Sequence, residues 1–201
     1  MSIQHIVFDL GNVVVGWNPR ALYAQAFPDA KKLDWFFENV CTDEWNVKMD
    51  GGKSFNVSIA EKQAEFPGYA EQIAWWKTRW HEMITGEIAG TVAIIDQLHA
   101  NGASLYALSN WSAETFPYAR KHFPSLAKFK DIVLSGDVKA TKPQREIYDI
   151  AVAKWNVDPA TLLFIDDSPK NVAGAIAAGW NAMHFTSPNA LAFELNARGL
   201  L

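Results

Sequence analysis

The sequence predicts an α/β fold, a doubly wound parallel sheet of the Rossmann-like kind that carries an inserted helical cap. Five short runs of residues are nearly continuous in apolar side chains, as in parallel strands that are covered on both faces. Helical patterns separate the later runs, which gives the β-α-β order of a doubly wound sheet. The predicted strands are residues 3–10, 104–109, 131–135, 161–166 and 181–186.

Three helices are expected between these strands. The first, over 90–100, has apolar residues at helical spacing and ends at an Asn-Gly pair, which is a helix stop signal. The second, over 143–155, begins with a proline, a residue favoured in the first helical turn. The third, over 169–178, is rich in alanine and ends before Gly179.

A long insertion follows the first strand. From residue 17 to 86 the sequence shows helical patterns and turns but no convincing strand. Because about 70 residues are too many for a loop, we expect a helical subdomain. The predicted division is an α/β core over 1–16 and 87–201 and a helical cap over 17–86. The expected cap helices are residues 19–27, 31–40, 55–66 and 69–83.

Tryptophans are concentrated in this insertion, where they recur near helical spacing and are expected to form the core of the cap. Trp17, Trp45 and Trp111 lie near the expected junctions of cap and core or after a strand end. They are therefore the better candidates for a substrate pocket.

The composition excludes several classes of protein. The chain has 201 residues, of which 49% are hydrophobic and 20% charged, so it can bury a sizeable core. A net charge of −4 without a basic block argues against a nucleic-acid partner. A single cysteine, Cys41, fits a reducing compartment. With no signal peptide or apolar run of membrane-spanning length in the sequence, we expect a cytoplasmic protein without a membrane partner, either a monomer or a homodimer.

The predicted first, second and fourth strands each end in polar residues, and a lysine precedes the helix over 143–155. Taken singly, each residue could be a turn or capping residue. Because the carboxyl ends of parallel strands meet at one edge of a sheet, we expect these residues to form one site. They are Asp9, Ser109, Asn110, Lys142, Asp166 and Asp167.

This set of residues has a definite chemistry. Three converging carboxylates make the hard oxygen site that Mg²⁺ prefers. The ammonium of Lys142 and the hydroxyl of Ser109 can bind the oxygens of an anionic substrate. Asp9 can act as a nucleophile when a cation and the lysine screen its approach to a phosphoryl group.

In combination, these motifs resemble the haloacid dehalogenase-like hydrolases. The matching segments are residues 8–13, 108–110, 142–143 and 165–171. The insertion resembles that of the subgroup with a helical cap after the first strand. Within the family the chain is most similar to bacterial sugar-phosphate phosphatases and to the phosphatase domain of epoxide hydrolases.

The resemblance implies a magnesium-dependent phosphatase of small phosphorylated metabolites. Asp9 would attack phosphorus, forming an aspartyl-phosphate that water hydrolyses, with Ser109 and Lys142 as the other catalytic residues. Mg²⁺ would be held by Asp9, the carbonyl of Gly11, Asp166 and Asp167. The residues expected to bind substrate are Gly11, Asn12, Ser109, Asn110, Trp111, Lys142 and Arg20.

The sequence departs from the family pattern at one position. Typical phosphatases of the family have a second aspartate two residues after the nucleophile, which acts as general acid and base. Here that residue is Gly11, and Asn12 cannot replace its function. A leaving group of low pKa or a cap residue such as Asp43, Glu44 or Asp50 could compensate.

Two other functions remain open. A 2-haloacid dehalogenase also lacks the second aspartate, and Asn110, Trp111 and Arg20 could form its halide cradle. The acidic pair after the fourth strand argues against it, since two carboxylates would repel a carboxylate substrate. The third reading is a weakly active module that binds a phosphorylated metabolite. Turnover of an aryl phosphate would separate this module from an enzyme.

Overall fold

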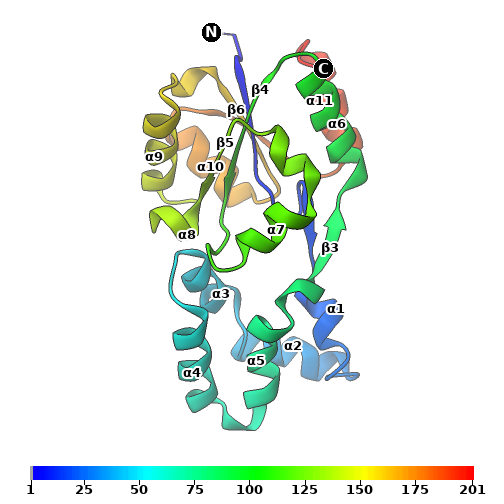
Figure 1. The fold of residues 1–201 in the computed structure, drawn as a ribbon, viewed down its shortest axis with the longest axis vertical. Helices are drawn as coiled ribbons and strands as arrows, with labels where there is room; N and C mark the ends of the chain where they lie inside the picture. Colours follow the sequence, from blue (N-terminus) through cyan, green and yellow to red (C-terminus); the bar gives the residue numbers. More distant parts are fainter. Residues whose placement is uncertain (1) are drawn as a thin grey trace.

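A five-stranded parallel sheet, in the order β5-β4-β1-β6-β7, forms the centre of the computed structural model, which describes residues 2–201 (Figure 1). All five predicted strands form, with small differences in their bounds. The strands are β1 (His5–Phe8), β4 (Ser104–Ser109), β5 (Asp131–Leu134), β6 (Leu162–Asp166) and β7 (Asn181–His184).

The strands are nearly continuous apolar runs because both faces of the sheet are covered, as the sequence predicted. On β1, Ile6 and Phe8 pack into one hydrophobic cluster and Val7 into another, because successive side chains point to opposite faces. Figure 1 shows the helices in two layers beside the sheet. The first cluster includes α6 (Ala89–Ala100) and α11 (Pro188–Ala197), and the second α9 (Arg145–Trp155) and α10 (Pro169–Ala177).

The three helices predicted between the strands are present, but α9 begins at Arg145 rather than at residue 143. The backbone N–H of Gln144 donates to the carbonyl of Thr141 at 2.9 Å, so these residues form a turn before the helix. In the α/β core the structure adds three helices that the sequence patterns did not predict. They are α7 (Phe116–His122), α8 (Ser135–Val138) and α11.

A helical insertion connects β1 to β4 and lies beyond the carboxyl edge of the sheet (Figure 1). The predicted helix over 69–83 divides at Arg79, and the one over 19–27 ends early. One helix, α3, was not predicted, because Trp45 and Met49 are its only buried residues. The elements are α1 (Pro19–Tyr23), α2 (Ala30–Asn39), α3 (Asp43–Asp50), α4 (Phe55–Glu65), α5 (Ala70–Thr78) and the 3₁₀ turns η1 (Pro67–Tyr69) and η2 (Trp80–Met83).

The expectation that no strand lies between residues 17 and 86 is wrong. β2 (Val15–Trp17) and β3 (Ile84–Glu87) form an antiparallel two-stranded ribbon that joins both ends of the insertion to the sheet. Gly16 pairs with Gly86 in this ribbon, and glycine weakens a strand signal in the sequence. A Cβ on Gly16 would lie 2.0 Å from Oγ1 of Thr85, so the Thr85 side chain would have to turn away to admit a larger residue there.

Aromatic side chains form the interior of the insertion. The sequence predicted this position for the tryptophans of the insertion, and most of them have it. Trp45, Trp76 and Trp80 are buried, whereas Trp35 is 42% exposed. The rings of Trp45 and Trp76 lie edge to face, 5.3 Å apart. Among residues 2–201, every helix is too short or too polar to cross a membrane.

Candidate active site

Asp9 stands directly after β1, at the carboxyl edge of the sheet. Its backbone N–H donates to the carbonyl of Ile165 at 2.8 Å, which ties the end of β1 to β6. One carboxylate oxygen accepts a hydrogen bond of 2.7 Å from the backbone of Leu10. The connections from β1 and β6 leave in opposite directions along the sheet, so Asp9 lies at a topological switch point.

Lys142 is the buried cation of this edge. Its Nζ lies 2.9 Å from Oδ1 of Asp9 and 2.7 Å from Oδ2 of Asp166. It also donates to the carbonyl of Leu108 at 2.9 Å. The three donors of the ammonium are therefore matched by three oxygens. This geometry joins three segments that the sequence predicted to converge.

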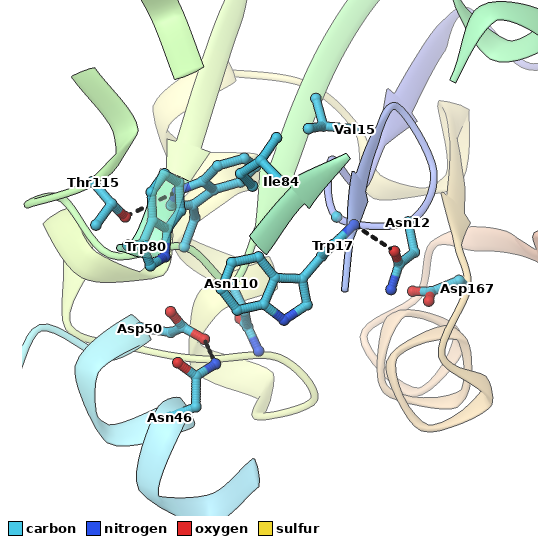
Figure 2. A pocket seen from close by; sticks show the side chains of 12 residues that line it. Asn12, Val15, Trp17, Asn46, Asp50, Trp80, Ile84, Asn110, Thr115 and Asp167 are labelled. Carbon is cyan, nitrogen blue, oxygen red and sulfur yellow. Dashed lines mark hydrogen bonds between the residues drawn. The ribbon is translucent and has the colours of Figure 1, made fainter. Parts of the chain in front are cut away.

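The acidic pair at the end of β6 has two different environments. Asp166 is fully buried, and its carboxylate accepts 3.1 Å hydrogen bonds from Nδ2 of Asn171 and one of 2.8 Å from the backbone N–H of Ser168. Asp167 is half-buried, and its carbonyl lies 2.9 Å from Nε2 of His184. Asp166 is thus fixed in place, while the side chain of Asp167 faces the cavity described below (Figure 2).

The three carboxyl groups form a cluster that fits a divalent cation. One oxygen from each of Asp9, Asp166 and Asp167 lies within 4.8 Å of the others. Three ionised carboxylates against one ammonium leave two formal negative charges, and oxygen donors are those that Mg²⁺ prefers. The carbonyl of Gly11 as a further ligand remains a prediction.

The electrostatics of the cluster follow from its burial. Burial raises the pKa of Asp9 to about 7, with Lys142 opposing the shift and Asp166 adding to it. Burial also raises the pKa of Asp167, and the charge of Asp166 acts in the same direction. For Lys142 burial favours the neutral amine, but the two carboxylates outweigh it and hold its pKa above the usual value.

A cavity of about 150 Å³ adjoins this cluster, between the sheet edge, the ribbon and the insertion (Figure 2). Gly11 and Asp167 line it next to the acidic cluster, and Asn46 and Asp50 line it from α3. The other lining residues are Asn12, Val15, Trp17, Trp80, Ile84, Asn110, Trp111 and Thr115.

Three indole rings form a continuous aromatic wall of this cavity. The centroid of Trp80 lies 5.7 Å from that of Trp17 and 5.9 Å from that of Trp111. Of the three tryptophans predicted for a pocket, Trp17 and Trp111 are there. Trp45 is not, because it packs inside the insertion and its Nε1 donates to the carbonyl of Ser58. From the sequence, Trp80 was expected in the core of the cap. The one signal for its place at the cavity was its position near the end of the predicted helix over 69–83.

The predicted substrate-binding residues have different surroundings. Asn110 forms two hydrogen bonds with the backbone of Lys142, of 3.0 and 2.9 Å, so its amide positions the lysine. Asn12 has a φ of 53°, and its Oδ1 accepts from the backbone N–H of Trp17 at 2.9 Å. Its Nδ2 points toward the cavity (Figure 2). Ser109 is the last residue of β4 and is buried.

The structure does not bring Arg20 into this cavity. Its exposed guanidinium pairs with Asp34, and it lines a second cavity together with Asp43 and Glu44. Of the three cap acids considered from the sequence, only Asp50 lines the cavity beside Gly11.

The carboxyl group of Asp50 is held by both parts of the molecule. Its Oδ2 accepts from Nδ2 of Asn46 at 2.8 Å, and the backbone N–H of Ser112 also donates to it. The carbonyl of Asp50 accepts a 2.6 Å hydrogen bond from Oγ of Ser135 on α8. Burial raises the pKa of Asp50 to about 8 against these hydrogen bonds, and the charge of Asp9 contributes to the rise.

Comparisons with known proteins show the family of this chain. A family model described as haloacid dehalogenase-like hydrolase matches residues 3–179. The sesquiterpene phosphatase AstK of Aspergillus oryzae is 27% identical over 200 residues, which cover 96% of this chain and 95% of that protein.

Two solved structures share the fold. A haloacid dehalogenase family enzyme of Bacteroides thetaiotaomicron, in complex with magnesium and inorganic phosphate, has a TM-score of 0.70 at 18% identity, covering 92% of this chain and 96% of that one. The L-2-haloacid dehalogenase of Xanthobacter autotrophicus has a TM-score of 0.65 at 15% identity, covering 99% and 84%. At these identities the likeness shows the fold alone.

Proposed function

Because the chain belongs to the haloacid dehalogenase-like hydrolases, we propose that it is a magnesium-dependent phosphatase of small phosphorylated metabolites, with Asp9 as nucleophile. The observation that carries this proposal is the cluster of Asp9, Asp166 and Asp167 around the buried Lys142. A cluster of this charge favours a bound cation and, beside it, an anionic phosphoryl group. The phosphatase relative supports the same reaction.

Each residue then has a distinct task. An oxygen of Asp9 attacks phosphorus and displaces the leaving group, and water later hydrolyses the aspartyl-phosphate. Lys142 offsets the negative charge between nucleophile and phosphoryl group, and Asn110 keeps Lys142 in place. Magnesium held by Asp9, Asp166 and Asp167 would supply charge neutralisation at the phosphoryl oxygens.

The cavity supports a leaving group with an apolar body. Trp17, Trp80 and Trp111 offer ring faces to the leaving-group side, whereas Asn12 and Asn46 offer hydrogen bonds. Two classes of substrate are therefore to be compared. The first is sugar phosphates, which the sequence led us to expect, and the second is aromatic or isoprenoid phosphates. The aromatic wall favours the second class, as does the sesquiterpene phosphatase relative.

The ribbon of β2 and β3 supports the division into a core over 1–16 and 87–201 and a cap over 17–86. Both connections between the two parts pass through this ribbon, and Gly86 has a φ of 101°. Cap and core also meet at Asp50 and Ser135. The ribbon is therefore the hinge about which the cap would open to admit a small molecule.

Dehalogenation of a 2-haloacid is the second candidate, because Gly11 stands where a phosphatase has its second aspartate. The two functions separate in one panel of assays. Phosphate release from phenyl, isoprenyl and sugar phosphates, and halide release from 2-chloropropionate, would each be measured with Mg²⁺ and with EDTA. Magnesium-dependent phosphate release supports the proposal. Halide release in EDTA without phosphate release contradicts it, and binding of a phosphate ester without turnover indicates the metabolite-binding module.

A further inference from the structure

The cavity lacks an acid where the phosphatase reaction needs one. The leaving oxygen of an alkyl phosphate is a strong base, so it must receive a proton as its bond to phosphorus breaks. Gly11 cannot supply it. A Cβ built on Gly11 meets no atom within 4 Å, so the surroundings do not exclude a side chain there. The proton donor has to be sought elsewhere on the cavity wall.

We propose that Asp50, supplied by the cap, is the general acid and base of the reaction; the inference rests on the proposed phosphatase function. Among the described residues that line the cavity, the only carboxyl groups are those of Asp50 and Asp167. Asp167 belongs to the acidic cluster that would hold the metal. Asp50 faces the cavity from the opposite side, across from Asn12 and Asp167 (Figure 2).

Helix stability does not explain an aspartate at this position. Asp50 is the last residue of α3, where the helix dipole disfavours a negative charge. Instead, its carboxyl group accepts hydrogen bonds from Asn46 and from the backbone of Ser112, and its carbonyl accepts from Ser135. These contacts come from α3, from the loop after β4 and from α8, so they fix the carboxyl group relative to the sheet edge.

The protonation of Asp50 suits this task. Its raised pKa of about 8 means that the carboxyl group carries a proton at neutral pH. The charged groups nearby are Asp9 and Asp167 across the cavity and, on the α8 side, the exposed Lys139, whose Nζ donates to the carbonyl of Gly136 at 2.6 Å. No cation pairs directly with Asp50 among the described residues.

The proton balance closes over one turnover. Asp9 forms a bond to phosphorus while the bond from phosphorus to the leaving oxygen breaks, and that oxygen takes the proton of Asp50. The Asp50 carboxylate then accepts a proton from water as the water oxygen attacks phosphorus. The bond between phosphorus and Asp9 breaks, inorganic phosphate leaves, and Asp50 is protonated again.

The test compares leaving groups in the Asp50→Asn variant. A 4-nitrophenolate needs little protonation, whereas the alkoxide of 2-phenylethyl phosphate needs it fully, and both esters present an aromatic ring to the tryptophans. We expect kcat/KM to fall at least about 100-fold for the alkyl ester and less than about 10-fold for the nitrophenyl ester. Since kcat/KM reports the first chemical step, slow hydrolysis of the aspartyl-phosphate does not mask this difference. That later step should produce a burst of nitrophenolate.

Asp43→Asn is the matched control. It removes an exposed acid of the same helix that lines the second cavity, and it should leave the ratio of the two kcat/KM values unchanged. Gly11→Asp in the Asp50→Asn background places an acid where the space permits one, and should recover at least about 10-fold of the alkyl activity. Should Asp50→Asn not fold, Asp50→Ser carries the same comparison.

Equal losses on the two esters, or no loss on the alkyl ester, would overturn the assignment of Asp50 and leave the phosphatase function standing. A wild-type protein that turns over neither ester would overturn the proposed function itself.

Discussion

Replacing Lys142 by methionine tests whether the buried charge cluster is built as described. The substitution keeps most of the length and of the apolar surface of the side chain but removes the ammonium. Asp9 and Asp166 then remain buried side by side without their cation, and the carbonyl of Leu108 loses its donor. We expect loss of phosphatase activity together with a large loss of stability.

The magnitude follows from the burial of the group. Lys142 is 3% exposed, and removing one partner of a buried ion pair costs about 3–5 kcal/mol. For a chain of this length each kcal/mol lowers Tm by about 2–4 °C. The expected decrease in Tm is therefore roughly 6–20 °C.

The assay is thermal unfolding in EDTA at pH 8.5 and pH 5.5. Burial already raises the pKa of Asp9 to about 7, and without the ammonium no cation opposes that rise, so the folded variant binds more protons than the unfolded one. Its stability then falls as pH rises, and the deficit relative to wild type is smaller at pH 5.5. Lys154→Met is the control, because it removes a half-exposed ion pair with Asp131 that is worth less than about 1 kcal/mol. A Tm for Lys142→Met within a few degrees of this control, or a larger deficit at pH 5.5, would show that the ammonium does not stabilise the two carboxylates as described.

Three further predictions concern the metal, the cap acid and the substrate. Mg²⁺ should raise the Tm of the wild-type protein above its value in EDTA, and Asp167→Asn should reduce that rise; an equal rise in the variant counts against Asp167 as a ligand. Folding raises the pKa of Asp50 from near 4 to about 8, so its contribution to stability falls as pH rises through that window. Asp50→Asn should therefore gain Tm relative to wild type between pH 5 and pH 8.5, and parallel pH curves would contradict the burial of this carboxyl group. Turnover of a phosphorylated folded protein should be negligible beside that of small esters, because the cap covers the site, and rapid turnover would show that it does not.

The sheet was predictable because its central strands, β4, β1 and β6, are short apolar runs that are mostly buried. All five residues of β6 are buried, for example, and no amphipathic helix has that pattern. The ribbon was not predictable in the same way. β2 has three residues and β3 has four, and each contains a glycine. They are recognised as strands only because they pair with each other.

The convergence of Asp9, Lys142 and Asp166 could be predicted because the ends of parallel strands meet at one edge. The places of Trp80 and Asp50 depend on how the insertion packs against the sheet. The hydrogen bond between Ser135 and Asp50, for instance, joins residues 85 positions apart in the chain. No local pattern in the sequence specifies such a contact. The positions of Trp80 and Asp50 at the cavity could therefore be found only from the folded structure.

The most direct test of Asp9 as a magnesium-dependent nucleophile is phosphate release from phenyl phosphate by the wild-type protein and the Asp9→Asn variant, each with Mg²⁺ and with EDTA. Asparagine is nearly isosteric with aspartate but is not an adequate nucleophile, and the carboxylate of Asp9 belongs to the cluster that would hold the cation. We expect phosphate release only by the wild-type protein with Mg²⁺, and less than about 1% of that rate in the other three reactions. Comparable rates from the Asp9→Asn variant, or an undiminished wild-type rate in EDTA, would contradict this expectation.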